Sequence, residues 1–143
     1  MMYNYRMKKV KTDILHTLAK FAEANDGSNV RFAAALVRNN KIVSVGFNRM
    51  KSHPFQAKFA KNEQAIFLHA EVHAIKNALR DYSVEELSKM DLYITRVKKP
   101  TSYSEHYVWG LAKPCCGCQR AIAEFGIRNV VYTTDEHGCY EVM

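Results

Sequence analysis

Apolar side chains recur along the chain with two different periods, and these periods predict alternating helices and strands. Residues 7–24 place apolar side chains at helical spacing, which predicts a first helix. Its inner face would hold Val10, Ile14, Leu18, Phe21 and Ala22. Residues 31–38 and 41–48 are shorter, largely apolar runs joined by Asn39-Asn40. Two asparagines between such runs favour a tight turn, so these residues predict a β-hairpin.

The middle of the chain continues with a longer helix and a short one. Residues 63–80 have helical spacing, and Asn62 is the predicted N-cap. The inner face of this helix would hold Ile66, Ala70, Ala74 and Ala78. The pattern Ser83-x-x-Glu86 is typical of a capping box and predicts a short helix over residues 84–89.

The last third of the chain predicts strand, helix and strand. Residues 91–97, DLYITRV, have the composition of a strand. Residues 116–125 have helical spacing and end at Gly126, and a strand over 128–134 follows. The tail after Gly138 leaves room for one brief strand.

Two irregular segments interrupt this order. Residues 49–62 are basic, contain Pro54 and predict a long loop, and residues 98–108 predict an extended hairpin or flap. The remaining elements, a hairpin and two strand–helix–strand crossovers, predict one α/β domain over residues 1–143. Its sheet would be mixed, with four to five strands and helices on both faces.

The composition is that of a globular protein, because 48% of the residues are apolar and 24% are charged. The chain contains no run of 18 apolar residues, and its start has no apolar stretch of the kind found in signal peptides, so we expect no membrane association. All four cysteines lie in the last fifth of the chain, which is a poor framework for disulfides; they are Cys115, Cys116, Cys118 and Cys139. We therefore expect a reduced, cytoplasmic protein.

The formal net charge of +7 suits anionic ligands, from a mononucleotide phosphate to a nucleic-acid backbone. Scattered surface lysines that only keep the protein in solution explain the same charge equally well. The charge therefore leaves a nucleic-acid partner open and does not decide for one.

Two short motifs contain candidate metal ligands. H-A-E covers residues 69–71, and P-C-C-G-C covers residues 114–118. Alone, the C-x-x-C of Cys115 and Cys118 fits a zinc site, a redox pair or chance. Its place at the start of a predicted helix favours thiolates, which zinc binding and redox chemistry both require. A redox pair would not explain H-A-E. The pair His69 and His73 has the spacing of a metalloprotease zinc site, but the order H-A-E-V-H differs from that motif and leaves the cysteines unused.

Together, H-A-E followed by P-C-x-x-C is the pattern of zinc-dependent nucleobase deaminases. The chain resembles the cytidine and deoxycytidylate deaminase superfamily, in the H-A-E branch that also contains tRNA adenosine deaminases. The resemblance extends over nearly the whole chain, because G-F-N at 46–48, LYIT at 92–95 and GIRNVVY at 126–132 also have counterparts in the family. It implies the three-layer α-β-α fold of cytidine deaminases.

The resemblance also implies the roles of the motif residues. His69, Cys115 and Cys118 would bind a zinc ion (Zn²⁺) and leave its fourth position open to water, as catalytic zinc sites do. Glu71 would shuttle protons between the water, the ring nitrogen and the leaving amine. Cys116 would lie in the spacer without a chemical role, and Pro114 would start the helix.

The resemblance further implies contacts with a substrate. In the family, the asparagine at the end of the G-x-N strand binds the sugar, which points to Asn48; a turn-forming asparagine is the alternative. The residue within H-A-E that offers its backbone to the base corresponds to Ala70. Ala33-Ala34 stand where a Gly-Ala pair is commoner, so Ala33 would line a slightly narrower pocket floor.

Two departures from the family pattern bear on the substrate. A long segment separates Thr95 from Pro114, and its aromatic residues, with Trp109 foremost, could stack on a base or could cover the edge of the core. The basic loop before the catalytic helix could meet a phosphate or could be a solvated surface. Its candidate side chains are Arg49, Lys51, His53, Lys58 and Lys61.

These observations lead to three functional hypotheses. The favoured one is hydrolytic deamination of cytosine to uracil in dCMP or a related pyrimidine nucleotide, by a protein that assembles as a homo-oligomer. The alternative is deamination of cytosine or adenosine in single-stranded DNA or tRNA, supported by the charge and the aromatic segment. The third is a non-catalytic zinc module that binds nucleic acid, against which Glu71 argues because a structural zinc site needs no acid–base group.

Overall fold

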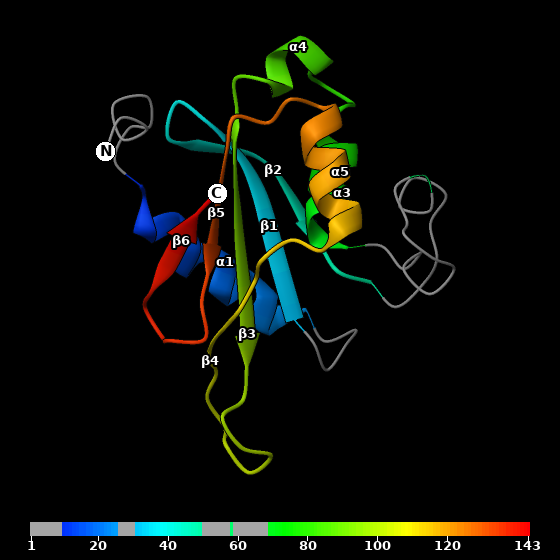
Figure 1. Cartoon of the computed structure of the whole chain (residues 1–143). Coiled ribbons are helices and arrows are strands. Elements are labelled where there is room, and N and C mark those ends of the chain that lie inside the picture. Colours follow the sequence, from blue (N-terminus) through cyan, green and yellow to red (C-terminus); the bar gives the residue numbers. More distant parts are fainter. Residues whose placement is uncertain (1–9, 26–30, 50–57, 59–68) are drawn as a thin grey trace.

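The structure is a computed structural model that describes residues 10–25, 31–49, 58 and 69–143. These residues form one mixed sheet in the order β2-β1-β3-β5-β6, with the short β4 paired to β3 (Figure 1). The strands are β1 (Arg31–Arg38), β2 (Lys41–Phe47), β3 (Asp91–Lys98), β4 (Val108–Gly110), β5 (Asn129–Thr133) and β6 (Tyr140–Val142). Among the described strands, β3 and β5 alone pair in parallel. The described part of the sheet thus has six strands, one more than the upper predicted number, because the segment after β3 forms the three-residue β4; β6 is the brief strand predicted for the tail.

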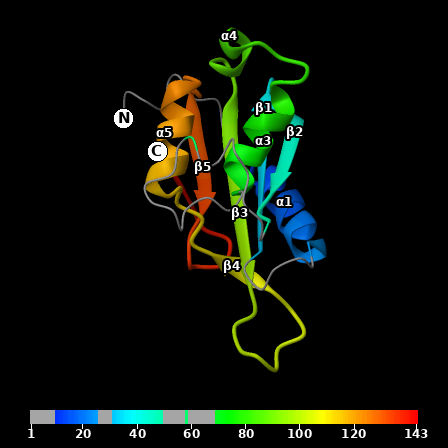
Figure 2. The same cartoon turned by 90° about the vertical axis from the view of Figure 1, so that its right-hand side faces the viewer.

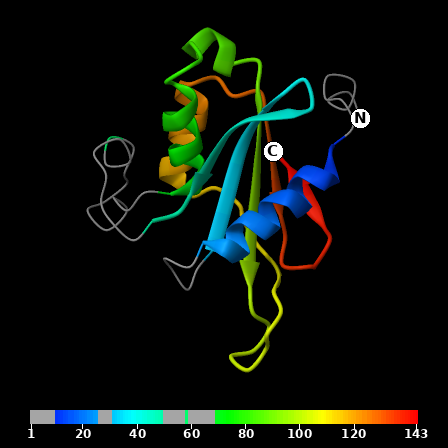
Figure 3. The same cartoon turned by 180° about the vertical axis from the view of Figure 1, so that it is seen from behind.

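Helices cover both faces of the sheet, as predicted. Helix α1 (Thr12–Ala24) lies across one face, and α3 (Ala70–Ala78) and α5 (Cys116–Glu124) lie side by side on the other (Figures 1 and 3). Figure 2 shows α1 and α5 on opposite sides of the strands. Alternate residues of β1 belong to two separate hydrophobic cores. Ala33 and Ala35 pack under α1, whereas Ala34 and Leu36 pack under α3 and α5.

The predicted hairpin of β1 and β2 is confirmed. Asn39 and Asn40 have positive φ angles of 52° and 66°, as the two central residues of a type I′ turn require. Asparagine tolerates this left-handed conformation better than most residues do, so the two asparagines determine where the chain reverses. The antiparallel register then pairs Ala33 with Phe47 at the open end of the hairpin.

The first helix is shorter than the predicted 7–24, because it begins at Thr12 and Lys11 is its N-cap; residues 1–9 lie outside the described part of the chain. Its buried residues are Ile14, Leu15, Leu18, Ala19 and Ala22. The prediction that Phe21 belongs to this face is wrong, since 39% of its surface is exposed. Leu15 and Ala19 occupy the sheet-facing side instead, which turns position 21 toward solvent.

The second long helix also differs from its prediction. Helix α3 begins at Ala70, and His69 is its N-cap with an extended backbone (φ −89°, ψ 155°), so a continuous helix over 63–80 is wrong. The predicted cap Asn62 and the apolar Ile66 lie outside the described residues. Helix α4 (Val84–Leu87) begins with the predicted capping box, in which Ser83 and Glu86 each accept a hydrogen bond from the other's backbone N–H.

The irregular segment after β3 is an extended hairpin, as predicted for residues 98–108. Residues Val108–Gly110 form β4 and pair antiparallel with the end of β3, so that Arg96 lies opposite Gly110. The chain then runs directly to the start of α5. Among the described helices, none has the length and apolarity needed to cross a membrane.

Candidate metal centre

His69, Cys115 and Cys118 come together where α3 and α5 begin. Their ligand atoms all lie within 4.8 Å of one another, although 46 and 49 residues separate the histidine from the two cysteines. His69 Nδ1 lies 3.2 Å from the Sγ of Cys118 and 3.5 Å from the Sγ of Cys115. This is the one cluster of potential metal ligands among the described residues, and it contains the three predicted ones.

The local backbone explains why these side chains meet. His69 and Cys115 are the N-caps of α3 and α5, and both have an extended backbone, which directs the chain away from the helix axis at that residue. The two helices lie side by side with their N-termini at the same end (Figure 1). Cys118 lies in the first turn of α5 and is buried, whereas Cys115 is exposed. The free N–H groups of a helix N-terminus favour negative charge and hence thiolates.

Hydrogen bonds among the three ligand side chains shift their pKa values. The Cys118 thiol donates to Cys115, which together with His69 lowers the pKa of Cys115 to about 3. The same hydrogen bond, together with burial, raises the pKa of Cys118. The hydrogen bond with Cys115 raises the pKa of His69, against the opposing effect of burial. Cys115 therefore carries the negative charge, and a metal ion that binds all three ligands must displace the protons held by Cys118 and His69.

The donor set fits zinc. One imidazole nitrogen and two thiolate sulfurs are zinc ligands, and a set of three leaves one tetrahedral position open, as in catalytic zinc sites. His73 does not join the set, because its Nδ1 accepts a hydrogen bond of 2.9 Å from the backbone N–H of Phe47. His73 therefore ties α3 to β2, and the metalloprotease pairing with His69 is wrong.

Glu71 lies in the first turn of α3, beside the three ligands. It is only 5% exposed, and burial raises the pKa of its carboxyl group. Hydrogen bonding with Cys118 and the charge of His69 act in the opposite direction. A buried carboxyl group with a raised pKa next to a metal site takes up a proton more readily than an exposed one, which suits a proton carrier.

Several residues outside the H-A-E and P-C-C-G-C motifs hold α3 against β2. The hydroxyl of Ser44 donates to the carbonyl of Ala74, and Asn77 Nδ2 donates to the carbonyl of Val45 over 2.9 Å. Gly46 brings the backbone of β2 against that of α3. The glycine of G-F-N was the available sequence signal, because a glycine inside a strand often marks close backbone contact.

A second set of contacts holds the segment that leads into α5. Thr133 is fully buried, and its hydroxyl donates to the carbonyl of Gly110 over 2.7 Å. The backbone N–H of Ala112 donates to the carbonyl of Thr133 over 2.9 Å. Gln119 Nε2 then donates to the carbonyl of Pro114 over 2.8 Å. The segment between β4 and Cys115 is thus held by hydrogen bonds to β5 and to α5.

The predicted substrate contacts are only partly near this centre. Ala70 is fully buried in the core between α3 and the sheet. The Oδ1 of Asn48 accepts hydrogen bonds from the backbone N–H of Phe32 at 3.0 Å and from Asn25 Nδ2 at 3.2 Å. Asn48 thus joins the ends of β2, β1 and α1. His53 lies outside the described residues.

The structure places Ala33 and Trp109 on the face of the sheet opposite the metal centre. Ala33 packs in the core under α1, and Ala34 is the residue of the pair on the face of the metal centre. Trp109 is 2% exposed and belongs to the same α1 core, so the interpretation that it covers the core is confirmed. Alternation along β1 and β4 is the physical reason, because neighbouring side chains point to opposite faces.

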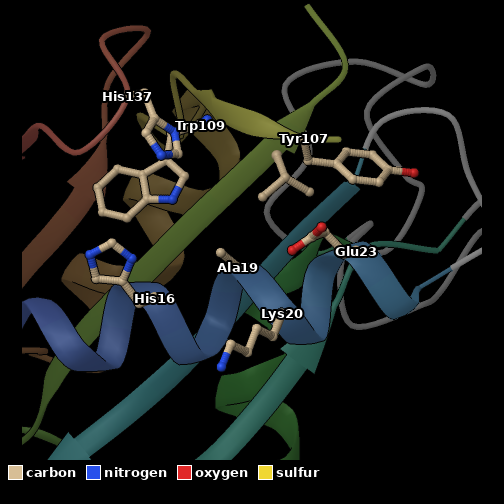
Figure 4. A pocket seen from close by; sticks show the side chains of 8 residues that line it. His16, Ala19, Lys20, Glu23, Tyr107, Trp109 and His137 are labelled. Carbon is tan, nitrogen blue, oxygen red and sulfur yellow. Dashed lines mark hydrogen bonds between the residues drawn. The ribbon is translucent and has the colours of Figure 1, made fainter. Parts of the chain in front are cut away.

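Trp109 forms one wall of a surface pocket of about 170 Å³ on that far face (Figure 4). Its ring centroid lies 4.9 Å from that of His16 and 5.5 Å from that of His137. Tyr107 lines the same pocket, whereas Tyr103 is 93% exposed. The aromatic residues of the β3–β4 segment are therefore not gathered around the metal ligands.

Cys116 and two residues of the basic loop can also be placed. Cys116 is exposed and takes no part in the ligand cluster, as predicted for the spacer. Arg49 is exposed, and Lys58 forms an ion pair of 3.7 Å with Glu124 of α5. Lys51 and Lys61 lie outside the described residues.

Comparisons with known proteins agree with this site. Residues 8–134 match the family described as the cytidine and deoxycytidylate deaminase zinc-binding region. A comparison with curated protein sequences found no match. Among solved structures, the fold is similar to a cytidine deaminase from Burkholderia pseudomallei, with 23% identity, a TM-score of 0.60, and coverage of 94% of this chain and 92% of that one.

Two structures of a dCMP deaminase from the cyanophage S-TIM5 are also similar. The apo form has 23% identity and a TM-score of 0.52, and covers 89% of this chain and 87% of that one. The complex with dCMP and dUMP has 22% identity and a TM-score of 0.54, and covers 87% and 83%. These likenesses show the fold, and the family match contains all three metal ligands and Glu71. The chain belongs to the cytidine and deoxycytidylate deaminase family of zinc-dependent enzymes.

Proposed function

We propose that this deaminase hydrolyses cytosine to uracil in a pyrimidine mononucleotide, with dCMP as the favoured substrate, and releases ammonia. The observation that carries the proposal is the buried carboxyl group of Glu71 beside His69, Cys115 and Cys118. A site that only held a structural zinc ion would need a fourth protein ligand and no proton carrier. The cyanophage relative in complex with dCMP and dUMP supports the choice of nucleotide.

Zinc bound by the three residues would supply Lewis-acid activation of the attacking water. Glu71 then accounts for the proton movements. Its carboxylate accepts a proton from the water as the oxygen bonds to C4 of cytosine, and gives that proton to ring nitrogen N3. A second proton from the adding oxygen passes through Glu71 to the amino group, which leaves as ammonia while C4 becomes a carbonyl.

The raised pKa of Glu71 suits both halves of this cycle. A carboxyl group at its ordinary pKa would give up a proton readily but would take one up poorly near neutral pH. Burial raises its pKa, because burial disfavours the charged form, so the group takes up a proton more readily. Hydrogen bonding with Cys118 links the Glu71 side chain to the ligand cluster.

The base would lie on the face of the sheet that carries the metal centre. Ala34 and Ala70 belong to the same core cluster on that face, and both side chains are small. Asn48 stands at the end of β2, next to Phe32, where the sugar would lie beyond the base. Small side chains at these two positions suit the close approach of a flat ring, and the polar asparagine suits a sugar hydroxyl.

The polynucleotide alternative is weaker than the sequence suggested. Its aromatic support depended on Trp109, which lies on the far face of the sheet. The net charge of +7 remains in its favour. A cytoplasmic location and assembly as a homo-oligomer remain predictions.

A substrate panel tests the proposal directly. The zinc-loaded enzyme would be assayed for ammonia release from dCMP, CMP, cytidine, deoxycytidine, dCTP, guanine, adenosine, single-stranded DNA and tRNA. We expect the highest kcat/KM for dCMP. Turnover of polymers alone would contradict the proposal and support the alternative. Stoichiometric zinc without turnover of any compound would also contradict it.

A further inference from the structure

Arg96 in β3 lies on the same face of the sheet as the metal centre. Side chains of β3 alternate, and Leu92 and Ile94 belong to the core under α3 and α5. Arg96 follows Ile94 by two positions and therefore points to the same face. Its guanidinium carbon lies 5.5 Å from the ring centroid of Phe32, which packs against that core.

The side chain of Arg96 is closely packed, and one of its buried donors is left without a hydrogen-bond partner. Its Nε is buried and has no hydrogen-bond partner among the described residues. None of the ion pairs in the described part of the chain includes Arg96. The neighbouring acid, Asp135, accepts hydrogen bonds from Lys98 at 2.9 Å and from the backbone N–H of Leu111 at 3.1 Å.

Gly110 makes room for this arrangement. A Cβ at Gly110 would lie 3.0 to 3.3 Å from Cδ, Cγ and Nε of Arg96, so the stem of the arginine lies flat against the glycine. The stem is thereby held between Gly110 on β4 and Phe32 on β1, the two residues that face Arg96 in the sheet register. The structure fixes the arginine without a direct ion pair among the described residues; its charge acts on Asp135, whose pKa is lowered mainly by Lys98 and to a smaller extent by Arg96.

A buried charged donor without a partner is costly, and such groups in proteins are normally satisfied. A ligand anion is the missing partner that fits the chemistry. The planar guanidinium binds phosphate through two parallel hydrogen bonds and remains charged at all physiological pH values.

Arg96 lies on the same face of the sheet as the residues proposed to contact the base and the sugar. Ala34 and Ala70 lie on the same face near the metal ligands, and Phe32 is the next residue of β1 on that face. Asn48, the predicted sugar contact, bonds to the backbone of Phe32, and Phe32 pairs with Arg96 in the sheet. Base, sugar and phosphate sites would thus follow one another across β1 to β3.

We propose that Arg96 binds the 5′-phosphate of the substrate and so makes this enzyme select a mononucleotide over the nucleoside. This inference rests on the proposed cytosine deamination. It names a residue outside both the zinc-binding motifs and the basic loop.

The test compares Arg96→Gln and Arg96→Lys with the unchanged enzyme, all loaded with zinc. The measured quantity is the ratio of kcat/KM for dCMP to kcat/KM for deoxycytidine. We expect this ratio to fall on the order of 10²-fold in Arg96→Gln, because a buried charged contact is lost. Arg96→Lys keeps the charge but not the planar fork, so its ratio should fall by about tenfold. Arg38→Gln is the matched control, since Arg38 pairs with Glu86 at the other end of β1.

A ratio that stays unchanged in Arg96→Gln while dCMP is still turned over would overturn the inference and leave the proposed function standing. An equal loss of ratio in Arg38→Gln would also overturn it. A fall in activity toward single-stranded DNA with no change in the dCMP ratio would assign Arg96 to a polynucleotide phosphate and contradict the proposal.

Equilibrium binding separates this inference from the proposed function. Binding of dUMP and deoxyuridine to the zinc-loaded protein can be measured by calorimetry without any turnover. Weaker binding of dUMP to Arg96→Gln, with zinc content and melting temperature preserved, supports the phosphate contact even if the substrate panel fails. Equal binding of dUMP to both proteins overturns it.

Discussion

The backbone of Gly46 in β2 lies directly against that of Ala74 in α3. A Cβ at Gly46 would lie 2.2 Å from the backbone nitrogen of Ala74, a distance that no real contact allows. This close backbone contact determines the distance between α3 and the sheet. Because Glu71 and the N-cap His69 belong to the same end of α3, the glycine controls the position of both.

Gly46→Ala should therefore shift α3 and damage both stability and activity. We expect the free energy of unfolding to fall by about 1–3 kcal/mol or more, the cost of overpacking a tight contact. Urea denaturation and zinc content would measure the two effects. Ser44→Ala, which removes one hydrogen bond to Ala74, is the graded comparison and should cost about 0.5–1.5 kcal/mol. A Gly46→Ala protein as stable as the original would show that α3 does not depend on this contact.

Glu71→Gln should separate metal binding from proton transfer. The amide has nearly the same shape but cannot carry a proton, so we expect stoichiometric zinc and a kcat lower by about 10² to 10⁴-fold. Zinc analysis and ammonia release measure the two properties on one sample. Glu85→Gln is the control, because Glu85 lies on α4 and is exposed. Near-normal turnover by Glu71→Gln would remove Glu71 from the mechanism.

The three neighbouring cysteines should respond differently to replacement by serine. Cys115→Ser and Cys118→Ser each remove a zinc ligand, so bound zinc and activity should both be lost. Cys116→Ser should keep both, since Cys116 is exposed and outside the cluster. Metal content after gel filtration is the direct readout. Zinc loss in Cys116→Ser equal to that in its neighbours would contradict the assignment.

Zinc affinity should fall as the pH is lowered. The pKa values of Cys118 and His69 are raised, so these two ligands hold protons that zinc must displace. The pKa of Cys115 is lowered to about 3, so this thiolate contributes little to the pH dependence near neutrality. Competition with a chelator at several values between about pH 6 and 8 would give the slope. An affinity independent of pH would mean that neither Cys118 nor His69 holds a proton before zinc binds.

Substitutions of Trp109 should affect stability more than catalysis. Trp109 is buried in the α1 core, so Trp109→Ala should cost about 3–5 kcal/mol of unfolding free energy. Trp109→Phe keeps most of the packing and should leave KM for the substrate near its original value. Thermal melting and steady-state kinetics would measure both. A raised KM in Trp109→Phe, with melting unchanged, would restore Trp109 as a substrate contact.

The sequence by itself determined most of the elements and the chemistry of the metal centre. The sequence features behind these elements are local: the apolar periodicity, the Asn39-Asn40 turn and the capping box at Ser83. Local backbone energetics therefore suffice to predict them. The motifs H-A-E and P-C-x-x-C, through their resemblance to zinc-dependent deaminases, predicted the three ligands that the structure brings together and a proton carrier at Glu71.

Only the tertiary structure decided which side chains share a face with that centre. Ala33 and Ala34 are neighbours in sequence, yet one faces α1 and the other faces the metal ligands. Trp109 and Arg96 show the same division, since the tryptophan lies on the α1 face and the arginine on the face that carries the centre. A shift of one residue reverses the face of a strand side chain, and the packing of α3 and α5 determines which face holds the site. That choice depends on contacts between segments far apart in the chain, which no local pattern contains.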